Sequence, residues 1–436
     1  MHKNINDMKH LLILVCSALL IISCHKDDEP DSVTPPTKTT RSVMIYMSGE
    51  NNLTLTNGHR FLRTDLNEII EGSKQLADDE RLFVFVDSMN TSILKSGKPF
   101  IMEVHGGKQE VLQEFSSDFY SCDPEKFKEV LQWMTTNAPA ESYGLVLWGH
   151  ASGWAVSTDT IASTAAARVV DTRAYGQDDG TDHSIKKGIK WMNITQMARA
   201  LEQLPKFEFI FADCCNMMCA EVGYELRNAT NYLIGSPAEI PGDGAPYDKI
   251  VPYFFANGSA IYKGIIDTYF DYYIEGYKGE YLEGYSVPLS VIETQYMEQL
   301  AQATHDILNQ FTDGYPAYPE SATTGDIGFY WYYDTPIMYD MKAFIKSHTS
   351  AADYEKWEQV YTKAVPHYRM SLQWMTIYGF LESAFRRFNQ DESLYGCVSM
   401  FIPRNHYSYN IDPFYYNKTF KNYGWNRALE WERFGW

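Results

Sequence analysis

The stretches LVLWGH at residues 145–150 and FEFIFADCC at residues 207–215 decide how we expect this chain to fold. Each is a short apolar run that ends abruptly in polar residues, which is typical of a buried parallel strand whose carboxyl end faces a site. His150 closes the first run and Cys215 closes the second. If both strands belong to one sheet, the two residues meet at its edge, although 65 positions separate them.

A cysteine beside a histidine can perform nucleophilic chemistry. A thiolate is a strong nucleophile, and an imidazole can hold it deprotonated and later protonate a leaving amine. The segment after Cys215 has apolar residues at helical spacing, so we expect Cys215 at a strand-to-helix turn, where the helix N-terminus favours a thiolate. The backbone N–H groups of Ala151 and Cys215 could then face an oxyanion. The alternative is a structural cysteine and a core histidine.

The surrounding pattern alternates strands with helices. Expected strands are 41–47, 81–87, 143–148, 207–212 and 232–236, with helices near 58–73, 123–134 and 194–203. This alternation predicts an α/β fold with a mostly parallel sheet flanked by helices. Beyond about residue 290 the pattern loosens into helices at 293–311 and 354–365 and a strand at 396–403, which predicts a mixed C-terminal region.

The N-terminus has the features of an export signal. Lysines precede an apolar run, Leu11 to Ile22, that is too short for a comfortable membrane span and fits a signal core. The ending IISC at 21–24 resembles a bacterial lipobox, which makes Cys24 the expected lipidation site; ordinary signal-peptide cleavage nearby is the alternative. We therefore expect residues 1–24 to be a lipoprotein signal peptide.

Residues 25–40 are polar and rich in Pro and Thr, as in a disordered tether. The HKDDE run at 25–29 resembles the surface-export signal of some Gram-negative lipoproteins, which predicts a lipid-anchored protein of the outer membrane, exposed at the cell surface.

The formal net charge of −19 makes nucleic acid a poor partner and cationic substrates a good electrostatic match. We expect a first domain over 41–290 and an α+β region over 291–436 packed on it.

Five cysteines follow the anchor: Cys122, Cys214, Cys215, Cys219 and Cys397. An odd and clustered set does not predict a disulfide framework, despite export. The C-C-x3-C cluster could bind zinc, but no paired Cys and His set accompanies it.

Two local motifs resemble the clostripain family of cysteine peptidases. LVLWGHASGW at 145–154 is similar to that family's histidine motif, W-x-H-G-x-G-W. DCCNMMCAEVGYEL at 213–226 is similar to its cysteine motif, D-A-C-L-M-x-x-x-E-V-x-Y-E-L. YGQDDGTD at 175–182 and WMNITQMARAL at 191–201 match the segment between them, and IYMSGENNL at 45–53 matches the opening. The resemblance covers residues 41–290 well and the remainder faintly.

The resemblance implies a caspase-like fold and a Cys/His dyad that cleaves after Arg or Lys. It implies that His150 is the general base, that Cys215 is the nucleophile and that Asp213 helps to bind the basic side chain of the substrate. Asp243, in the loop after the next strand, is a second candidate for substrate binding, although a Gly-Asp-Gly turn needs no function to explain it. The chemistry requires no cofactor, and calcium is a possible activator.

Two positions depart from the family pattern. Ala151 replaces the glycine that usually follows the histidine, but alanine keeps its backbone N–H. Cys214 stands where the family usually has alanine, which leaves open that the neighbouring cysteine is the nucleophile. Adjacent strand residues face opposite ways, so only one of the two can point into the site.

The segment 155–190 is polar and contains candidate self-cleavage sites at Arg168, Arg173 and Lys187, which could also be ordinary basic residues of a solvated loop. Asp178, Asp179 and Asp182 could contribute to a calcium site or only to a turn, so the metal ligands stay unknown.

The resulting prediction is a lipid-anchored cysteine endopeptidase for proteins and peptides with Arg or Lys, with self-processing between His150 and Cys215 as a further expectation. Two rivals remain: a catalytically silent caspase-fold surface protein that binds peptide or glycan, and a peptidase of different specificity.

Overall fold

The computed structural model describes residues 39–89, 98–116, 119–157, 160, 174–181, 188–276, 285–310, 327–333, 335–376, 385–388, 391–402 and 419–431. Thr39–Trp436 forms one compact unit, so both predicted domains fall within it. Within the described ranges, no helix has both the length and the apolarity that crossing a bilayer requires.

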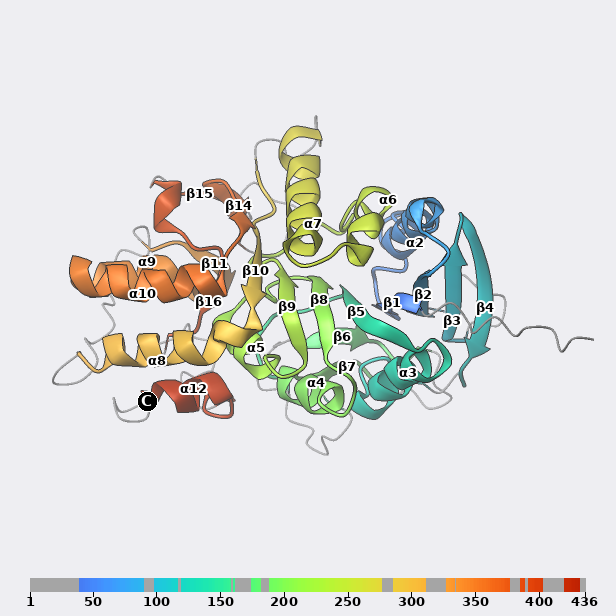
Figure 1. The fold of residues 1–436 in the computed structure, drawn as a ribbon, viewed down its shortest axis with the longest axis horizontal. Helices are drawn as coiled ribbons and strands as arrows, with labels where there is room; N and C mark the ends of the chain where they lie inside the picture. Colours follow the sequence, from blue (N-terminus) through green and yellow to red (C-terminus); the bar gives the residue numbers. More distant parts are fainter. Residues whose placement is uncertain are drawn as a thin grey trace, which may run out of the picture. The chain divides into compact units, whose positions relative to one another are not determined.

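Five parallel strands form the centre of a nine-stranded sheet (Figure 1). Their order is β2-β1-β5-β8-β9, and the bounds are β1 Thr39–Gly49, β2 Glu80–Ser88, β5 Ala140–Gly149, β8 Phe207–Asp213 and β9 Thr230–Gly235. All five are mainly buried, because helices cover both faces of the sheet, and this explains their nearly continuous apolar sequences. The strands predicted at 145–150 and 207–215 are neighbours, with Trp148 opposite Asp213.

Antiparallel strands extend both edges, so the whole sheet is mixed and the predicted parallel part is its centre. The hairpin of β3 (Phe100–His105) and β4 (Lys108–Glu114) pairs with β2. On the other side, β10 (Leu289–Glu293) pairs with β9, and β13 (Tyr368–Arg369) pairs with β10. The later part of the chain therefore contributes strands to the same sheet as the first part.

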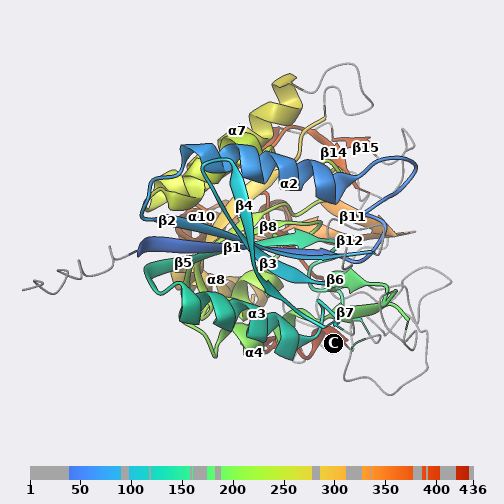
Figure 2. The same ribbon diagram turned by 90° about the vertical axis from the view of Figure 1, so that its right-hand side faces the viewer.

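Helices cover both faces of the sheet, as Figure 2 shows with the sheet seen edge-on. One face packs against α2 (Phe61–Gly72), α6 (Tyr247–Ile250) and α7 (Ser259–Asp271), and we call it the α2 face. The other packs against α3 (Pro124–Asn137), α4 (Ile194–Leu201) and α5 (Ala220–Glu225), and we call it the α3 face. Successive side chains of β1 point to opposite faces and so contribute to both cores. Val43, Ile45 and Met47 point to the α2 face, while Met44 and Tyr46 point to the α3 face.

The predicted start of α3 is observed. The carboxylate of Asp123 accepts a hydrogen bond of 2.9 Å from the backbone N–H of Glu125, and Pro124 occupies the first turn. A proline without an N–H fits there because that position has no intrahelical acceptor.

The later part of the chain contains four helices and further short strands in its described ranges. These are α8 Met297–Leu308, α9 Met341–His348, α10 Ala351–Ala364, α12 Gly424–Leu429, β11 Phe329–Tyr333, β12 Thr335–Asp340, β14 Gln373–Met375, β15 Phe385–Arg387 and β16 Ser399–Met400. Shorter elements are η1 Ser73–Gln75, β6 Tyr175–Asp178, β7 Lys190–Met192, η2 Val251–Phe255, η3 Tyr272–Gly276, η4 Thr294–Tyr296 and η6 Glu392–Leu394.

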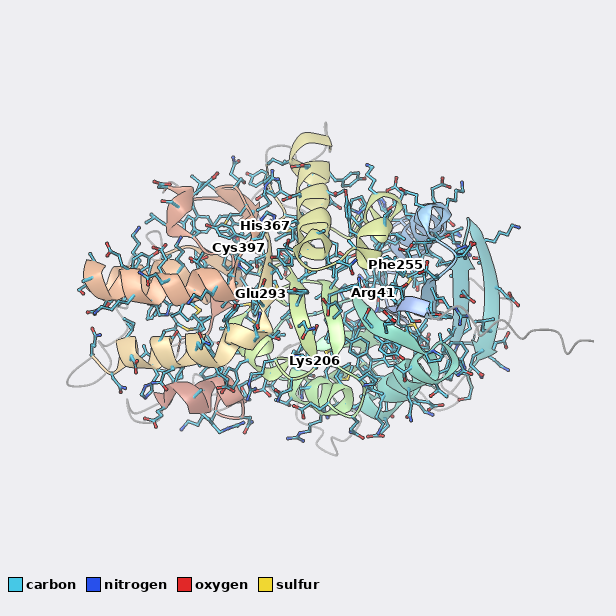
Figure 3. The ribbon with its side chains drawn as sticks, in the orientation of Figure 1. Arg41, Lys206, Phe255, Glu293, His367 and Cys397 are labelled. Carbon is cyan, nitrogen blue, oxygen red and sulfur yellow. The ribbon has the colours of Figure 1, made fainter. Side chains whose placement is uncertain are left out.

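Polar contacts join this later part to the central sheet. Figure 3 labels His367 and Cys397 on the side of the molecule where β10 runs. The hydroxyl of Ser290, in β10, donates to the carbonyl of Cys397 at 2.6 Å, and the N–H of Val291 donates to the carbonyl of His367 at 3.1 Å. The backbone of β10 is therefore held from both sides.

Contacts also reach the segment that follows Cys215. The N–H of Ser399 donates to the carbonyl of Met218 at 3.0 Å, and the N–H of Phe401 donates to Glu221 at 2.7 Å. The strand predicted at 396–403 thus lies beside the loop and helix that follow the candidate nucleophile.

Candidate active site

The carboxyl ends of the parallel strands bring His150 and Cys215 to the same edge of the sheet. Trp148 and Asp213 are paired across β5 and β8, and each of the two candidates follows its paired residue by two positions. Neighbouring strands lie about 4.8 Å apart. The structure therefore places both residues at adjacent strand ends, as the sequence predicts.

A sharp turn and an amide position His150. Gly149 has a φ of 143°, and a Cβ there would lie 2.9 Å from the carbonyl oxygen of Ser48, so a side chain would clash. The His150 Nε2 atom lies 2.6 Å from Asn52 Oδ1, and its carbonyl accepts from the N–H of Gly176 at 2.9 Å. Because an amide oxygen only accepts, this contact places the ring proton on Nε2.

Asn52 is a site residue that the sequence reasoning missed. It lies just beyond the end of β1, at the same edge of the sheet as His150, within the quoted stretch IYMSGENNL. The available signal was its position after a central strand, where polar residues gather at the site of a parallel sheet.

The backbone N–H of Ala151 is held in a defined orientation. Ala151 forms an antiparallel bridge with Tyr175. The hydrogen bonds on either side run from Gly176 N–H to the His150 carbonyl and from Ser152 N–H to the Ala174 carbonyl, each 2.9 Å long. In this arrangement the N–H of the central residue points away from its partner strand. Ala151 can therefore direct its N–H elsewhere, as an oxyanion donor must.

Cys215 lies in a loop and is half-buried. The backbone N–H of Ile240 donates to its sulfur at 3.5 Å. The next residue, Asn216, adopts a left-handed φ of 60°, and both its backbone N–H and its side-chain amide donate to carbonyls of Ala238 and Pro237 at 2.9 Å. The loop that follows β9 thus fixes the backbone on the far side of the nucleophile.

The expectation that Cys215 begins a helix is wrong. Helix α5 starts at Ala220, and residues 214–219 form turns and extended chain. The cause is local: the N–H of Met218 donates to the carbonyl of Ser236 at 3.0 Å, so this backbone pairs with the next loop and does not coil. The thiolate of Cys215 therefore gains no support from a helix N-terminus.

The neighbouring Cys214 is oriented the other way. Its side chain is buried in the core on the α3 face, and its thiol donates to the carbonyl of Leu147 at 3.3 Å. Burial, followed by the charges of Asp213 and Cys215, raises the pKa of the Cys214 thiol well above its usual value. A thiol in this state is a poor nucleophile. The remaining described cysteines, Cys122, Cys219 and Cys397, are also buried free thiols.

Asp213 points to the α2 face and is 3% exposed. Its Oδ2 accepts from the N–H of Ala245 at 3.1 Å and from the hydroxyl of Tyr247 at 2.9 Å, and its Oδ1 accepts from the hydroxyl of Tyr269 at 3.1 Å. Burial raises the pKa of Asp213 to about 6, and the three donors oppose that shift. A carboxylate has about four acceptor positions, so one remains for a cationic guest.

Asp243 lies in the loop that crosses these strand ends and is half-buried. The same loop provides the Ala245 N–H that contacts Asp213, and the charge of Asp243 contributes to raising the pKa values of Asp65 and Tyr273. The two acids predicted to bind substrate are therefore on one face of the sheet, near each other.

A second group of acids could hold a divalent cation. Oxygens of Glu50, Asp87 and Asp178 lie within 4.8 Å of one another, and all three residues are buried. Asp178 accepts from Ser121 and Gly180 backbone N–H groups at 2.8 and 2.9 Å. Burial and the charge of Glu50 raise the pKa of Asp178 to about 7.

Several predicted positions fall outside the described residues: Cys24, Arg168, Arg173, Lys187 and Asp182.

A half-buried thiol and an oriented imidazole at adjacent strand ends, beside a buried carboxylate, define a cysteine hydrolase on an α/β scaffold. Comparison with known proteins identifies the family. A sequence profile described as the clostripain family, Peptidase C11, matches residues 45–436, and the chain belongs to this family of cysteine peptidases.

Solved structures agree with this assignment. A secreted C11 cysteine protease from Bacteroides thetaiotaomicron, in complex with an irreversible peptide inhibitor, is 28% identical with a TM-score of 0.71. That alignment covers 90% of this chain and 99% of the other. An inactive zymogen C11 protease from Parabacteroides distasonis is 22% identical with a TM-score of 0.70, covers the same shares, and supports the fold. No curated protein sequence matches the chain. The caspase-like α/β fold and the peptidase class are thereby confirmed.

Proposed function

We propose that this cysteine peptidase hydrolyses peptide bonds after Arg or Lys, with Cys215 as nucleophile and His150 as general acid and base. The observation that carries the specificity is the buried carboxylate of Asp213, two residues before the nucleophile and fixed by three donors. A buried acid binds a guanidinium or ammonium group far better than a neutral side chain, because the cation supplies the missing charge.

The chemical steps follow from the positions of the side chains. The Cys215 sulfur attacks the scissile carbonyl carbon while Nδ1 of His150 takes the thiol proton. The N–H groups of Ala151 and Cys215 stabilise the oxyanion. When the carbon–nitrogen bond breaks, His150 returns the proton to the leaving amine, and water then hydrolyses the thioester with the same imidazole as base.

Asn52 has a positioning role in this scheme. Its amide oxygen accepts from Nε2 of His150 at 2.6 Å, which selects one tautomer and fixes the ring plane. An imidazole held in this way presents an unprotonated nitrogen to the thiol without rotating. We therefore expect Asn52 to affect turnover more than substrate binding.

The test is hydrolysis of fluorogenic peptides that end in Arg, Lys, Asp or Leu by residues 25–436 of the protein, under reducing conditions. The matched control is Cys215→Ala. Cleavage after Arg or Lys that disappears in Cys215→Ala supports the proposal. Cleavage after Leu or Asp in preference to Arg contradicts the specificity, and cleavage that survives in Cys215→Ala contradicts the nucleophile.

Self-processing belongs to the same proposal. Arg168, Arg173 and Lys187 lie between His150 and Cys215 in the chain, and such bonds are substrates for the proposed specificity. One structural relative is described as an inactive zymogen. Intact-mass measurement should find two fragments for the active protein and one chain for Cys215→Ala. A single intact chain in a fully active preparation would contradict self-processing.

Membrane attachment through Cys24 also remains a proposal, supported by the lipobox-like IISC at 21–24. The protein would be an exported lipoprotein of the outer membrane, exposed at the cell surface of a Gram-negative bacterium. Mass spectrometry of the N-terminal peptide should find acyl chains on Cys24, and protease treatment of whole cells should remove the protein. An unmodified N-terminus beyond residue 24 would contradict the anchor.

No cofactor takes part in the proposed chemistry, and calcium is proposed as an activator. Glu50, Asp87 and Asp178 supply hard oxygen ligands of the kind calcium prefers, and their oxygens are close enough to share one ion. Bound calcium would neutralise this buried acidic group and order the turn that begins at Asp178.

A further inference from the structure

Asp65 is a buried acid on the inner side of helix α2, where the sequence reasoning assigned no function. Its side chain is fully buried, and its Oδ2 accepts from the indole N–H of Trp148 at 2.6 Å. Its Oδ1 is buried without a hydrogen-bond partner. An unpaired buried carboxylate oxygen lowers the stability of the folded state. Its presence at Asp65 therefore indicates a possible role in function and not in stability.

Asp213 is the acid whose charge contributes most to raising the pKa of Asp65. Gly244 separates the two: a Cβ at this glycine would lie 2.9 Å from Asp65 Oδ2 and 3.0 Å from Asp213 Oδ2. The glycine, with a φ of 61°, therefore lies close to both carboxylates. Trp148 precedes His150 by two residues and pairs with Asp213 across the sheet, so one indole links the acid pair to the catalytic edge.

The charge around this pair is negative. The titratable groups that interact with one or both of these acids are Glu68 of α2, Asp243 of the following loop, Tyr247 of α6, Tyr269 of α7, Tyr272 and Tyr273 of η3 and Cys214 after β8. Asp248 and Lys249 of α6 act on Glu68. Lys249 is the basic member of this set, and its ammonium lies 4.7 Å from the ring centre of Tyr272. None of the described contacts of Asp65 or Asp213 is with a cation.

We propose that Asp65 and Asp213 act as a coupled carboxylate pair that carries one proton in total while no cation is bound, and that the pair releases this proton to solvent when a guanidinium or ammonium side chain binds. This inference rests on the proposed preference for Arg or Lys, and it names Asp65 as a positioning residue for that preference. Two adjacent buried carboxylates cannot both ionise without compensation, and one shared proton removes the conflict.

The proton balance explains how the pocket discriminates. In the empty pocket one carboxylic acid and one carboxylate carry a single negative charge. The entering cation makes full ionisation favourable, so the acid loses its proton to water and the pair gains a second negative charge opposite the ligand. A neutral side chain provides no such compensation. The pKa values of Asp65 and Asp213 are both raised, mainly by burial, which agrees with this scheme.

The experiment uses benzamidine, which carries a planar cation like that of arginine, with the Cys215→Ala form of residues 25–436. Calorimetric titrations at pH 6.5 in phosphate and in ACES, two buffers of different ionisation enthalpy, count the protons released on binding. We expect release approaching one proton per benzamidine in the otherwise unsubstituted pocket. We expect almost none in Asp65→Asn, with an affinity about tenfold lower at pH 8.

The matched control is Glu71→Gln, which removes an exposed carboxylate from the same helix and should release protons as the unsubstituted pocket does. Binding with no proton release in the unsubstituted pocket overturns the inference by itself, even if Asp65→Asn fails to fold, and leaves the preference for basic residues standing. Equal release in Asp65→Asn also overturns it. Absence of benzamidine binding, together with absence of cleavage after Arg or Lys, overturns the proposed function and this inference with it.

Discussion

The two faces of the sheet each bury a group of acids at the edge where the parallel strands end, but they stabilise these acids differently. On the α2 face, Asp65 and Asp213 accept mainly from an indole and from tyrosine hydroxyls. On the α3 face, Glu50 and Asp178 accept from backbone N–H groups and from Ser and Thr hydroxyls. Aromatic donors surround the acids of the α2 face, whereas short polar donors contact a group of acids on the α3 face whose oxygens lie within 4.8 Å of one another.

The difference teaches that burial alone does not identify the function of an acid. Burial is the largest cause that raises the pKa of Asp213 and of Asp178, to about 6 and about 7 respectively. The donors around each acid and the distance to its neighbours decide which cation could compensate it. Of these acids, only Asp213 on the α2 face lies close to the candidate nucleophile in the chain, two residues before it.

The largest expected effect distinguishes the two cysteines that follow Asp213. Cys215→Ala should reduce kcat/KM for a fluorogenic Arg peptide by on the order of 10⁴-fold or more, because it removes the nucleophile. Cys214→Ala should change it by less than about tenfold and lower the free energy of unfolding by about 1 kcal/mol, because that side chain lies in the core on the α3 face. Urea unfolding and initial rates measure both. Loss of activity in Cys214→Ala alone would reverse the assignment.

The next effect compares the two acid groups directly. Asp213→Asn should reduce kcat/KM for Arg peptides by about 10- to 100-fold, through KM, because it removes a charged hydrogen-bond acceptor for the guanidinium. Asp178→Asn, on the α3 face, should leave the ratio of Arg to Leu cleavage unchanged. Steady-state kinetics with both peptides measure this ratio. An Asp213→Asn enzyme that still prefers Arg would move the specificity to another residue.

The pH dependence of the free energy of unfolding should also distinguish Asp213 on the α2 face from Asp178 on the α3 face. Both acids have folded-state pKa values above the ordinary 3.8, so the folded state binds more protons than the unfolded state, and stability falls as pH rises through each window. The window ends near pH 6 for Asp213 and near pH 7 for Asp178. Each contributes a slope of up to about 1.4 kcal/mol per pH unit.

Between pH 6 and 7, Asp178→Asn should therefore flatten the fall in the free energy of unfolding, and Asp213→Asn should have little effect there. Urea unfolding at several pH values provides the comparison. Identical slopes for both variants and the unsubstituted protein would show that neither acid titrates in this range.

The smallest expected effect concerns calcium. Millimolar calcium should raise the melting temperature by a few degrees, since a ligand that binds only the folded state stabilises it in proportion to its saturation. The gain should be larger at pH 8 than at pH 6, because Asp178 must lose its proton to bind the ion. Glu50→Gln should abolish it, whereas Asp65→Asn should not. An equal gain in Glu50→Gln would place the ion elsewhere.

The sequence predicted the centre of the fold because long buried strands are locally distinctive. The expected strand 207–212 is observed as β8, and the expected helix 194–203 is observed as α4, within two residues. The hairpin of β3 and β4 was missed, because β4 is largely exposed and its sequence KQEVLQE lacks a clean alternation. Strand β10 was missed because its pairing with β9 is antiparallel and only three-dimensional context reveals it.

The site residues at strand ends could be predicted from the sequence, whereas those whose role depends on contacts between distant segments could not. His150 and Cys215 follow from the apolar runs before them. Asn52 and Asp65 could not be assigned a role, because a hydrogen bond to an imidazole or to an indole joins residues far apart in the chain. The helix predicted directly after Cys215 was wrong for the same reason. The apolar spacing is present, but the backbone N–H groups of Asn216 and Met218 donate to the loop after β9 and not to a helical turn.

The contact between Phe401 and Glu221 joins residues that are 180 positions apart, so it can form only after residue 401 has been synthesised. A shorter nascent chain lacks the segment that contacts Met218 and Glu221, just after the candidate nucleophile. The enzyme therefore stays incomplete until almost all of its length has emerged. Contacts between residues so far apart in the chain form late in folding, so this edge of the sheet is complete only when nearly the whole chain is present.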